Sequence, residues 1–336
     1  MTKQVVDCPV GGRIKHFQKN WEKLSKDQWI LETIRGLKLE FAQNPPIQIT
    51  TPTYHVFSKE KNELINKEII SMLEKKAICQ VEHSKDGFLS PIFLVEKKGG
   101  GQRPVINLRD LNGYLVYRHF KMEGINQVKD MIQQGDWLIK VDLKDAYFTI
   151  PICNVDQKYL RFPWEGNVYQ FQCLPFGITV APWVFTKLMK VPVSYLRRMG
   201  MRLIIYLDDI LVMNQTKKGA LEDGKKLRDV LESLGFLINL KKSILTPVQG
   251  IEFLGFIIDS NLMTLSLPTE KMKKIKKLCQ TILRSDVTTV RQLSEIIGNL
   301  TASLQAVQQF MLYDINSTNN QSYFFSIFCL FQNLFF

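Results

Sequence analysis

The spacing of apolar positions along the chain predicts a series of helices. Apolar side chains recur every three or four residues within 21–41, 60–79, 186–199 and 221–234, and again in two segments after Pro268. That period places them on one face of a helix. The sequence NPPIQITTPTYH, which follows the first of these segments, breaks its pattern. We therefore expect a small helical extension and then an extended linker before the rest of the chain.

Short apolar runs bounded by turn residues predict the strands. IFLVEKK and GGGQRPVINL predict a basic hairpin around a glycine-rich turn, and WLIKVDLKDAYFTIPI (137–152) predicts a strand that turns at Lys144-Asp145. LIIYLDDILVM (203–213) predicts a hairpin with the acid pair at its turn, and IEFLGFII (251–258) predicts a strand or tight hairpin. Because strands and helices interleave without regular βαβ spacing, the predicted fold class is α+β.

The composition is that of a folded protein with an excess of positive charge. Of 336 residues, 45% are hydrophobic and 23% are charged, and this length predicts two or three subdomains. Lysine and arginine number 44 against 32 acidic residues, which gives a formal net charge of +12. Such an excess favours a polyanionic partner, either nucleic acid or an anionic membrane surface.

Neither the cysteines nor the two ends of the sequence indicate a secreted or membrane protein. The 6 cysteines lack CxxC or CxxH spacing, which argues against a zinc knuckle or a disulfide framework and favours a reducing compartment. The N-terminus has no apolar signal region, and the apolar run at 323–336 is shorter than the about 20 residues of a spanning helix. We expect an intracellular protein, in the cytoplasm or nucleus, with no membrane partner and an aberrant apolar tail.

Three aspartates stand inside apolar runs: Asp142 in IKVDLKDAYF, and Asp208 with Asp209 in YLDD. If they converge, each charge raises the pKa of the others, and a hard divalent cation with oxygen ligands would relieve the repulsion. Two Mg²⁺ ions in such a cluster suit an in-line phosphoryl displacement, and therefore nucleotidyl transfer. The alternative for the acid pair is a solvated hairpin turn, because aspartate is a common turn residue.

Four segments carry a family resemblance: KVDLKDAYFTIPI (140–152), LPFGITVAPWVF (174–185), YLDDILV (206–212) and FLGFII (253–258). In this order and spacing they resemble the palm motifs of reverse transcriptases, which are RNA-directed DNA polymerases. Four segments are similar to the polymerase of DIRS-type retrotransposons, which also use RNase H and a tyrosine recombinase. They are GGRIKHFQKNW, SPIFLVEKKGGGQRPVINLRDLN, HFKMEGI and GDWLIKVDLKDAYF. The resemblance extends from about residue 11 to about residue 307.

The resemblance implies a right-hand polymerase of the α+β class, with fingers, palm and thumb and an antiparallel palm sheet packed on helices. The implied parts are an N-terminal helical extension and linker (1–59), fingers (60–137), palm (138–258, with a fingers insertion at about 153–172) and thumb or connection helices (259–310). Residues 311–336 form the aberrant apolar tail, and the family's RNase H domain is expected to be absent.

The resemblance also implies the catalytic centre. Asp142, Asp208 and Asp209 are the implied catalytic residues and metal ligands, and the carbonyl of Leu143 is an additional ligand. The implied cofactor is two Mg²⁺ ions, with Mn²⁺ as an alternative. Tyr147 matches the steric gate that leaves no room for a ribose 2′-hydroxyl, and its alternative is a core tyrosine at a strand end.

The resemblance places a dNTP pocket around the fingers hairpin and the palm. Arg103 matches the fingers arginine that closes on the triphosphate, and Lys98 is the alternative to Lys97 because of the glycine run between them and Arg103. For both lysines and Arg103, the alternative is a solvated surface turn. The full implied set is Lys97, Arg103, Asp145, Ala146, Tyr147, Phe176 and Gly177.

Three further assignments rest on the same resemblance. Lys242, or its neighbour Lys241, falls near the lysine that protonates the pyrophosphate leaving group and is a candidate general acid. At position 107 this sequence has Asn, where many retroviral relatives have an acidic residue. Lysines after Pro268 would form a thumb face against the duplex backbone, or a merely solvated helix face. The implied primer grip is Phe253, Leu254 and Gly255, and the lysine face is Lys271, Lys273, Lys274, Lys276 and Lys277.

The implied function is two-metal nucleotidyl transfer from dNTP to a primer 3′-hydroxyl on an RNA or DNA template. The implied partners are an RNA template, a DNA primer, the RNA–DNA hybrid and dNTPs, and the oligomeric state stays open. Two alternatives remain at this point: a truncated, inactive element product that only binds RNA–DNA hybrid, and a fragment of a longer reverse transcriptase/RNase H polyprotein.

Overall fold

The computed structural model describes residues 8–48, 57–82, 84, 86–96, 102–285 and 287–313. The chain divides into two compact units. The first contains described residues within 1–122, 141–210 and 222–244, and the second those within 123–140, 211–221 and 245–336. Among the described residues, no helix is both long and apolar enough to cross a membrane. The apolar run at 323–336 lies outside the described residues, and the predicted part boundaries stay a prediction.

The N-terminal segment of the first unit forms η1 (Arg13–Phe17), α1 (Gln18–Leu24) and α2 (Gln28–Gly36). The single helical pattern predicted over 21–41 is therefore interrupted. The interruption has a local cause, because the carboxylate of Asp27 accepts a hydrogen bond from the Ile30 amide at 3.2 Å and so starts a new helix. Trp21 is fully buried, and its indole N–H donates to the carbonyl of Leu234 at 3.0 Å.

The helix predicted over 60–79 is shorter than expected. It forms α3 (Lys59–Glu74), and β1 (Ile78–Val81) begins soon afterwards. Lys76 adopts a left-handed backbone with φ 51°, and the Ala77 amide donates to the Met72 carbonyl at 2.9 Å. This hydrogen bond closes the last turn of the helix, so the prediction was wrong at the helix's C-terminal end.

Two small antiparallel sheets follow in the first unit. The first has the order β1-β6-β5, with β5 (Arg161–Trp164) and β6 (Asn167–Phe171). The second pairs β2 (Ile92–Glu96) with β3 (Gln102–Ile106), in a register that sets Ile92 opposite Ile106. These two strands confirm the predicted hairpin, and its glycine-rich turn lies outside the described residues.

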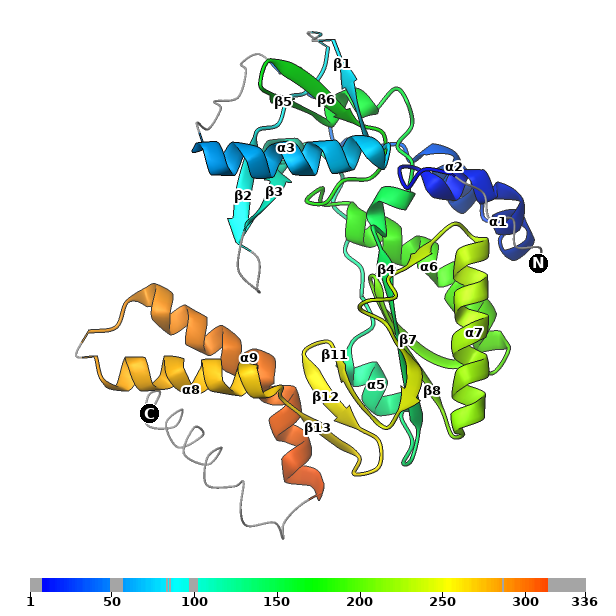
Figure 1. Cartoon of the computed structure of the whole chain (residues 1–336), viewed down its shortest axis with the longest axis vertical. Coiled ribbons are helices and arrows are strands. Elements are labelled where there is room, and N and C mark those ends of the chain that lie inside the picture. Colours follow the sequence, from blue (N-terminus) through cyan, green and yellow to red (C-terminus); the bar gives the residue numbers. More distant parts are fainter. Residues whose placement is uncertain are drawn as a thin grey trace. The chain divides into compact units, whose positions relative to one another are not determined.

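A five-stranded sheet contains the strands β4, β7 and β8 that Figure 1 labels. Its order is β10-β4-β8-β7, and β9 pairs with the end of β4. β4 and β8 are inner strands, and most of their residues are buried, including nearly all of the apolar ones. The strands are β4 (Trp137–Lys144), β7 (Arg202–Tyr206), β8 (Asp209–Asn214), β9 (Leu237–Ile238) and β10 (Ile244–Val248).

Helices and short turns connect these strands. α6 (Ala181–Arg198) contacts β7, and the Arg197 guanidinium donates to the Leu203 carbonyl at 2.7 Å. Pro182 stands in the first turn of α6, where a missing amide removes no helical hydrogen bond. The other connecting elements are α4 (Arg109–Asn112), α5 (Ile125–Met131), η2 (Tyr147–Thr149), η3 (Gln157–Tyr159) and α7 (Lys217–Ser233).

In the second unit, three short strands precede two helices. β11 (Gly250–Phe253), β12 (Phe256–Asp259) and β13 (Thr264–Ser266) form an antiparallel meander, followed by α8 (Thr269–Leu283) and α9 (Val290–Tyr313). The two-residue turn of the first hairpin has positive φ at Leu254 (51°) and Gly255 (74°), as a tight twisted hairpin requires. Of the two alternatives predicted at 251–258, a strand or a tight hairpin, the structure has the hairpin.

Candidate functional site

Asp142 is an acid in the middle of a buried strand. It lies in β4 between apolar neighbours, and only 5% of its surface is exposed. Its backbone is fixed at both polar groups, because its amide donates to Ser243 Oγ at 3.0 Å and its carbonyl accepts from the Asn239 amide at 2.8 Å. Both partners belong to the segment after β9, so that segment holds the aspartate in place.

The acid pair lies at a hairpin turn, as predicted, but the turn is one residue earlier than expected. β7 ends at Tyr206 and β8 begins at Asp209, so Leu207 and Asp208 are the turn residues. Leu207 has φ 53°, a conformation that is costly for a residue with a side chain, typically by about 1–3 kcal/mol. The carbonyl of Asp208 accepts a hydrogen bond from the Leu143 amide at 2.9 Å, which brings the turn against the strand that carries Asp142.

The charges of the three aspartates interact. Burial raises the pKa of Asp208, and the nearby charges of Asp209 and Asp142 raise it further. A hydrogen bond from its own backbone amide and the charge of Lys242 act in the opposite direction. Lys242 Nζ lies 4.0 Å from the carboxylate of Asp142, on a side chain that is 68% exposed. The structure therefore brings together Asp142, Asp208, Asp209 and the candidate general acid Lys242.

The chemistry of this cluster fits a divalent cation. The side chains offer carboxylate oxygens, the ligands that Mg²⁺ prefers, and their mutual repulsion is what a bound cation would relieve. Within the described residues, no three His, Cys, Asp or Glu side chains already stand as a group that could hold a metal ion. The donor type and charge fit, and the ligand arrangement stays a prediction.

Tyr147 lies beside the acid cluster in a group of aromatic rings. Its ring centroid is 5.1 Å from that of Phe176 and 5.5 Å from that of Phe185 in α6. Burial raises its pKa to about 12, with smaller contributions from the nearby Asp208 and Tyr206. The hydroxyl is therefore neutral at physiological pH. Phe176 is 50% exposed, so one side of this aromatic group is open.

Asn112 is a residue that the sequence reasoning missed. Its amide nitrogen donates to the Gly177 carbonyl at 2.9 Å, and its amide oxygen accepts from the Thr179 backbone amide at 2.8 Å. Asn112 therefore holds the loop that carries Phe176, and the left-handed Gly177 (φ 94°) lets that loop turn. No local pattern reveals these bonds, because the partners are more than sixty residues apart in sequence.

The turn after β4 is held by residues from the N-terminal half. Asp145 has φ 50° and forms a salt bridge with Lys75 at 3.0 Å. The carbonyl of Lys75 accepts from the Gly11 amide at 2.8 Å, and the Gly12 amide donates to the Phe148 carbonyl at 2.8 Å. The N-terminal Gly11-Gly12 pair thus supports the turn that leads from Asp142 to Ala146 and Tyr147. Sequence reasoning assigned no role to this pair.

The remaining predicted residues lie in other parts of the chain. Arg103 is exposed on β3, opposite Val95, and Lys97 and Lys98 lie outside the described residues. In the second unit, Phe253 is fully buried, and Leu254 and Gly255 form the turn of the β11–β12 hairpin.

The predicted lysine face on α8 is partly engaged within the second unit. Lys274 pairs with Glu295 of α9 at 3.1 Å, Lys273 pairs with Glu270 at 3.0 Å, and Lys271 Nζ lies 4.9 Å from the centroid of the Phe256 ring.

Comparisons with known proteins agree with these observations. Residues 95–258 match the family described as reverse transcriptase (RNA-dependent DNA polymerase). The Tf2-3 and Tf2-4 transposon polyproteins of Schizosaccharomyces pombe are each 27% identical to this chain over 250 residues. These 250 residues cover 72% of this chain and 17% of each polyprotein, so the chain spans less than a fifth of the length of these relatives.

Two solved structures of a foamy viral protease-reverse transcriptase have a similar fold. The complex with dsDNA has a TM-score of 0.63 at 20% identity, covering 88% of this chain and 63% of that chain. The complex with RNA/DNA hybrid has a TM-score of 0.61 at 19% identity, covering 89% and 41%. At these identities the similarity concerns the fold, and it confirms the predicted α+β polymerase fold.

Proposed function

We propose that this chain is an RNA-directed DNA polymerase, because residues 95–258 match the reverse transcriptase family and the chain is similar to retrotransposon polyproteins. It extends a DNA primer with dNTPs on an RNA or DNA template. The segments GGRIKHFQKNW and HFKMEGI assign it to the DIRS-type branch. The RNA–DNA hybrid product and an intracellular location are part of the same proposal.

One observation carries the proposal. The Leu143 amide donates to the Asp208 carbonyl at 2.9 Å, and this bond fixes the acid-bearing turn against the strand of Asp142. The charges of Asp142 and Asp209 act on Asp208, and the charge of Asp208 acts on Tyr147. Clustered carboxylates are the ligands that the two metal ions of a nucleotidyl transfer site need.

The reverse transcriptase family uses divalent metal ions, and the acid cluster offers their ligands. Asp142, Asp208, Asp209 and the Leu143 carbonyl would hold two Mg²⁺ ions, or Mn²⁺. When bound, these ions would supply activation of the primer 3′-hydroxyl and neutralisation of the charge on the leaving pyrophosphate. The buried position of Asp142 fits this role, because a carboxylate with so little exposure is stable as an anion only beside positive charge.

The side chains around the cluster bind and orient the substrates. Tyr147 fills the space under the sugar, where its ring, held between Phe176 and Phe185, excludes a ribose 2′-hydroxyl. The exposed Phe176 offers its ring to the incoming dNTP, and Asn112 positions the loop that carries it.

The phosphates of the dNTP meet the turn after β4 and the basic residues. The backbone of Asp145 and Ala146 faces the triphosphate, with the turn held by the salt bridge to Lys75. Arg103 and Lys97 bind the phosphates from the β2–β3 hairpin, since a guanidinium can bind phosphate oxygens in a bidentate manner. Lys242, which lies near Asp142, donates a proton to the pyrophosphate. The turn of the β11–β12 hairpin and the α8 lysines contact the primer and the duplex.

A primer-extension assay with purified protein tests this proposal. We expect extension of a DNA primer on an RNA template with Mg²⁺ or Mn²⁺ and dNTPs, and loss of extension by at least about a hundredfold in Asp208→Asn. Asp130→Asn, which makes the same chemical change at an exposed position of α5, is the matched control and should retain activity. A folded wild type that binds RNA–DNA hybrid but extends no primer would select the hybrid-binding alternative instead.

A further inference from the structure

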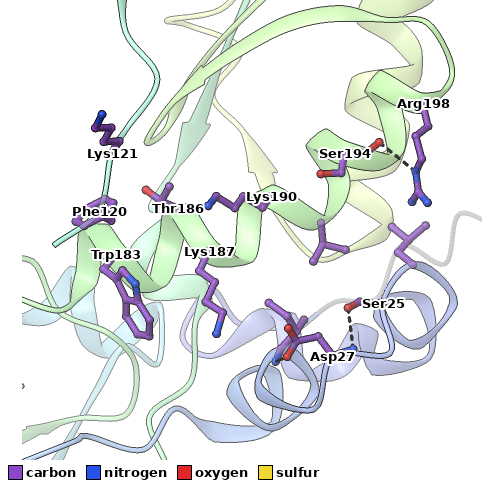
Figure 2. A pocket seen from close by; sticks show the side chains of 13 residues that line it. Ser25, Asp27, Phe120, Lys121, Trp183, Thr186, Lys187, Lys190, Ser194 and Arg198 are labelled. Atoms are coloured by element: carbon purple, nitrogen blue, oxygen red, sulfur yellow. Dashed lines mark hydrogen bonds between the residues drawn. The ribbon is translucent and has the colours of Figure 1, made fainter. Parts of the chain in front are cut away.

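One face of α6 carries cations that the proposed chemistry does not use. Lys187, Lys190 and Arg198 follow Trp183 at helical spacing, so all four lie along one stripe of the helix. Together with Lys121 they line a cavity of about 410 Å³ between α6 and the turn from α1 to α2. Figure 2 shows Lys187 extending from α6 toward that turn. We call this cavity the α6 groove.

Within the part of the chain that the structure describes, the cations of the α6 groove have no ion-pair partner. Among the described residues, no carboxylate lies within ion-pair distance of Lys121, Lys187, Lys190 or Arg198. Asp27 is the acid in the lining, and its carboxylate already accepts the Ile30 amide at the start of α2. The groove therefore presents an excess of positive charge to a ligand.

Aromatic side chains fix the position of this charge. Lys187 Nζ lies 3.8 Å from the centroid of the Trp29 ring and 5.5 Å from that of Trp183. The two indole rings pack edge to face, with centroids 5.1 Å apart, and the guanidinium of Arg118 lies 5.0 Å from the Trp183 centroid. A cation that is already held in place loses less entropy when it binds an anion.

The lining chemistry fits a chain of phosphates with planar apolar groups between them. Cations occur along the length of α6, whereas Leu24, Ile30, Phe120 and Val191 supply apolar surface between and opposite them. Basic grooves with aromatic and apolar surface are how proteins bind single-stranded nucleic acid without reading its sequence. An inorganic anion would leave the apolar surface unused, and a membrane would meet a concave surface rather than a protruding one.

We propose that the α6 groove binds the backbone of single-stranded nucleic acid, and that it holds the template outside the catalytic centre. The proposal rests on the proposed polymerase function for the identity of the strand. The two sites are separated by α6 itself, because Phe185 packs against Tyr147 whereas the stripe of Trp183, Lys187 and Lys190 lines the groove. A template held there would dissociate less often between additions.

Binding of a labelled RNA oligonucleotide, on the order of ten nucleotides long and followed by fluorescence anisotropy, tests the proposal without requiring turnover. The test variant is K121E/K190E, which changes two exposed lysines that have no partner among the described residues. We expect affinity to fall at least about tenfold, and the slope of log affinity against log salt to decrease by about 1.4, since each single-strand phosphate contact contributes about 0.7.

The matched control is K225E/K226E, which makes the same charge change at two exposed positions of α7. We expect it to change affinity by less than about threefold. Equal losses in both variants would show a general charge effect and would overturn the proposal, as would unchanged affinity in K121E/K190E. Thermal unfolding of each variant, and the neutral K121Q/K190Q, separate loss of binding from loss of folding.

Two further outcomes separate this proposal from its alternatives. If K121E/K190E loses affinity for vesicles of anionic lipid but keeps its affinity for RNA, the groove is a membrane-binding surface and the proposal fails. If the wild type extends no primer while its RNA affinity still depends on Lys121 and Lys190, the polymerase function fails and the groove assignment stands. Primer extension on a long template should give shorter products with K121E/K190E than with K225E/K226E.

Discussion

Asp208 influences the ionisation of Tyr147 because both lie in the same partly buried space. Burial and the charges of Asp209 and Asp142 raise the pKa of Asp208, and Asp208 in turn helps to raise the pKa of Tyr147 to about 12. The negative charge of the site therefore resides on carboxylates. An ionised Asp208 makes the metal-free folded state less stable, because the unfolded chain solvates the same carboxylate fully.

This cost predicts that Asp208→Asn stabilises the protein while it removes activity. Since the pKa of Asp208 in the folded state lies above the ordinary value for aspartate, stability decreases as the pH rises from the unfolded pKa through the folded pKa, and stays lower above both. The variant lacks this decrease. Thermal unfolding with a chelator should therefore show a higher midpoint for Asp208→Asn than for the wild type at pH 7, and no difference near pH 3. A lower midpoint at pH 7 would contradict the pKa argument.

The ring of Tyr147 predicts the choice of sugar. Tyr147→Ala should raise incorporation of rNTP relative to dNTP by at least about tenfold, because the space under the sugar opens. Tyr147→Phe keeps the ring and removes only the neutral hydroxyl, so its discrimination should stay within about threefold of the wild type. Single-nucleotide extension with matched dNTP and rNTP measures both ratios. Unchanged discrimination in Tyr147→Ala would remove the gate assignment and leave the polymerase proposal intact.

At the scale of elements, backbone hydrogen bonds connect the N-terminal glycines to Lys75 and to Phe148, which lie beside and after the turn that follows β4. Gly11 bonds to Lys75, and Lys75 forms the salt bridge to Asp145. A Cβ on Gly11 would lie 2.0 Å from the carbonyl oxygen of Lys76, which no side chain can do without a backbone shift. The glycine is therefore required by a close approach of two backbone segments.

Gly11→Ala should accordingly lower the free energy of unfolding by about 1–3 kcal/mol. Gly298→Ala is the matched comparison, because the same Cβ would meet nothing within 4 Å in the middle of α9. That change should leave the free energy of unfolding unchanged or raise it by up to about 1 kcal/mol, because alanine has a higher helix propensity than glycine. Denaturant unfolding measures both. A Gly11→Ala protein as stable as the wild type would show that the N-terminal segment can dock differently.

The elements differ in how far the sequence could predict them. The hairpins at 203–213 and 251–258 follow from local turn chemistry and apolar alternation, so they were predicted. The interruption between α1 and α2 was missed, because the spacing of apolar residues continues through it. The local signal is Asp27, whose side chain caps the start of α2. Asn112 was missed for a different reason, since its bonds to Gly177 and Thr179 exist only once distant segments meet.

For the whole molecule, the net charge of +12 predicts binding that depends on salt. If two or more duplex phosphates are neutralised, affinity for RNA–DNA hybrid should fall at least about tenfold between 50 and 200 mM salt. Fluorescence anisotropy at several salt concentrations measures this slope. An unchanged thermal midpoint over the same range would exclude unfolding as its cause, and a flat affinity would contradict charge-driven binding.

The α6 helix has a consequence for how this sequence can vary. Phe185 on one face packs against Tyr147, and the stripe of lysines on another lines the groove. Successive residues of an α-helix are rotated by about 100°, so adding or deleting a single residue between Phe185 and Lys187 would rotate Lys187 and Lys190 relative to Phe185, and the two faces could no longer meet their partners at the same time. Natural variants should therefore keep the spacing of this helix while accepting length changes in the loops that flank it.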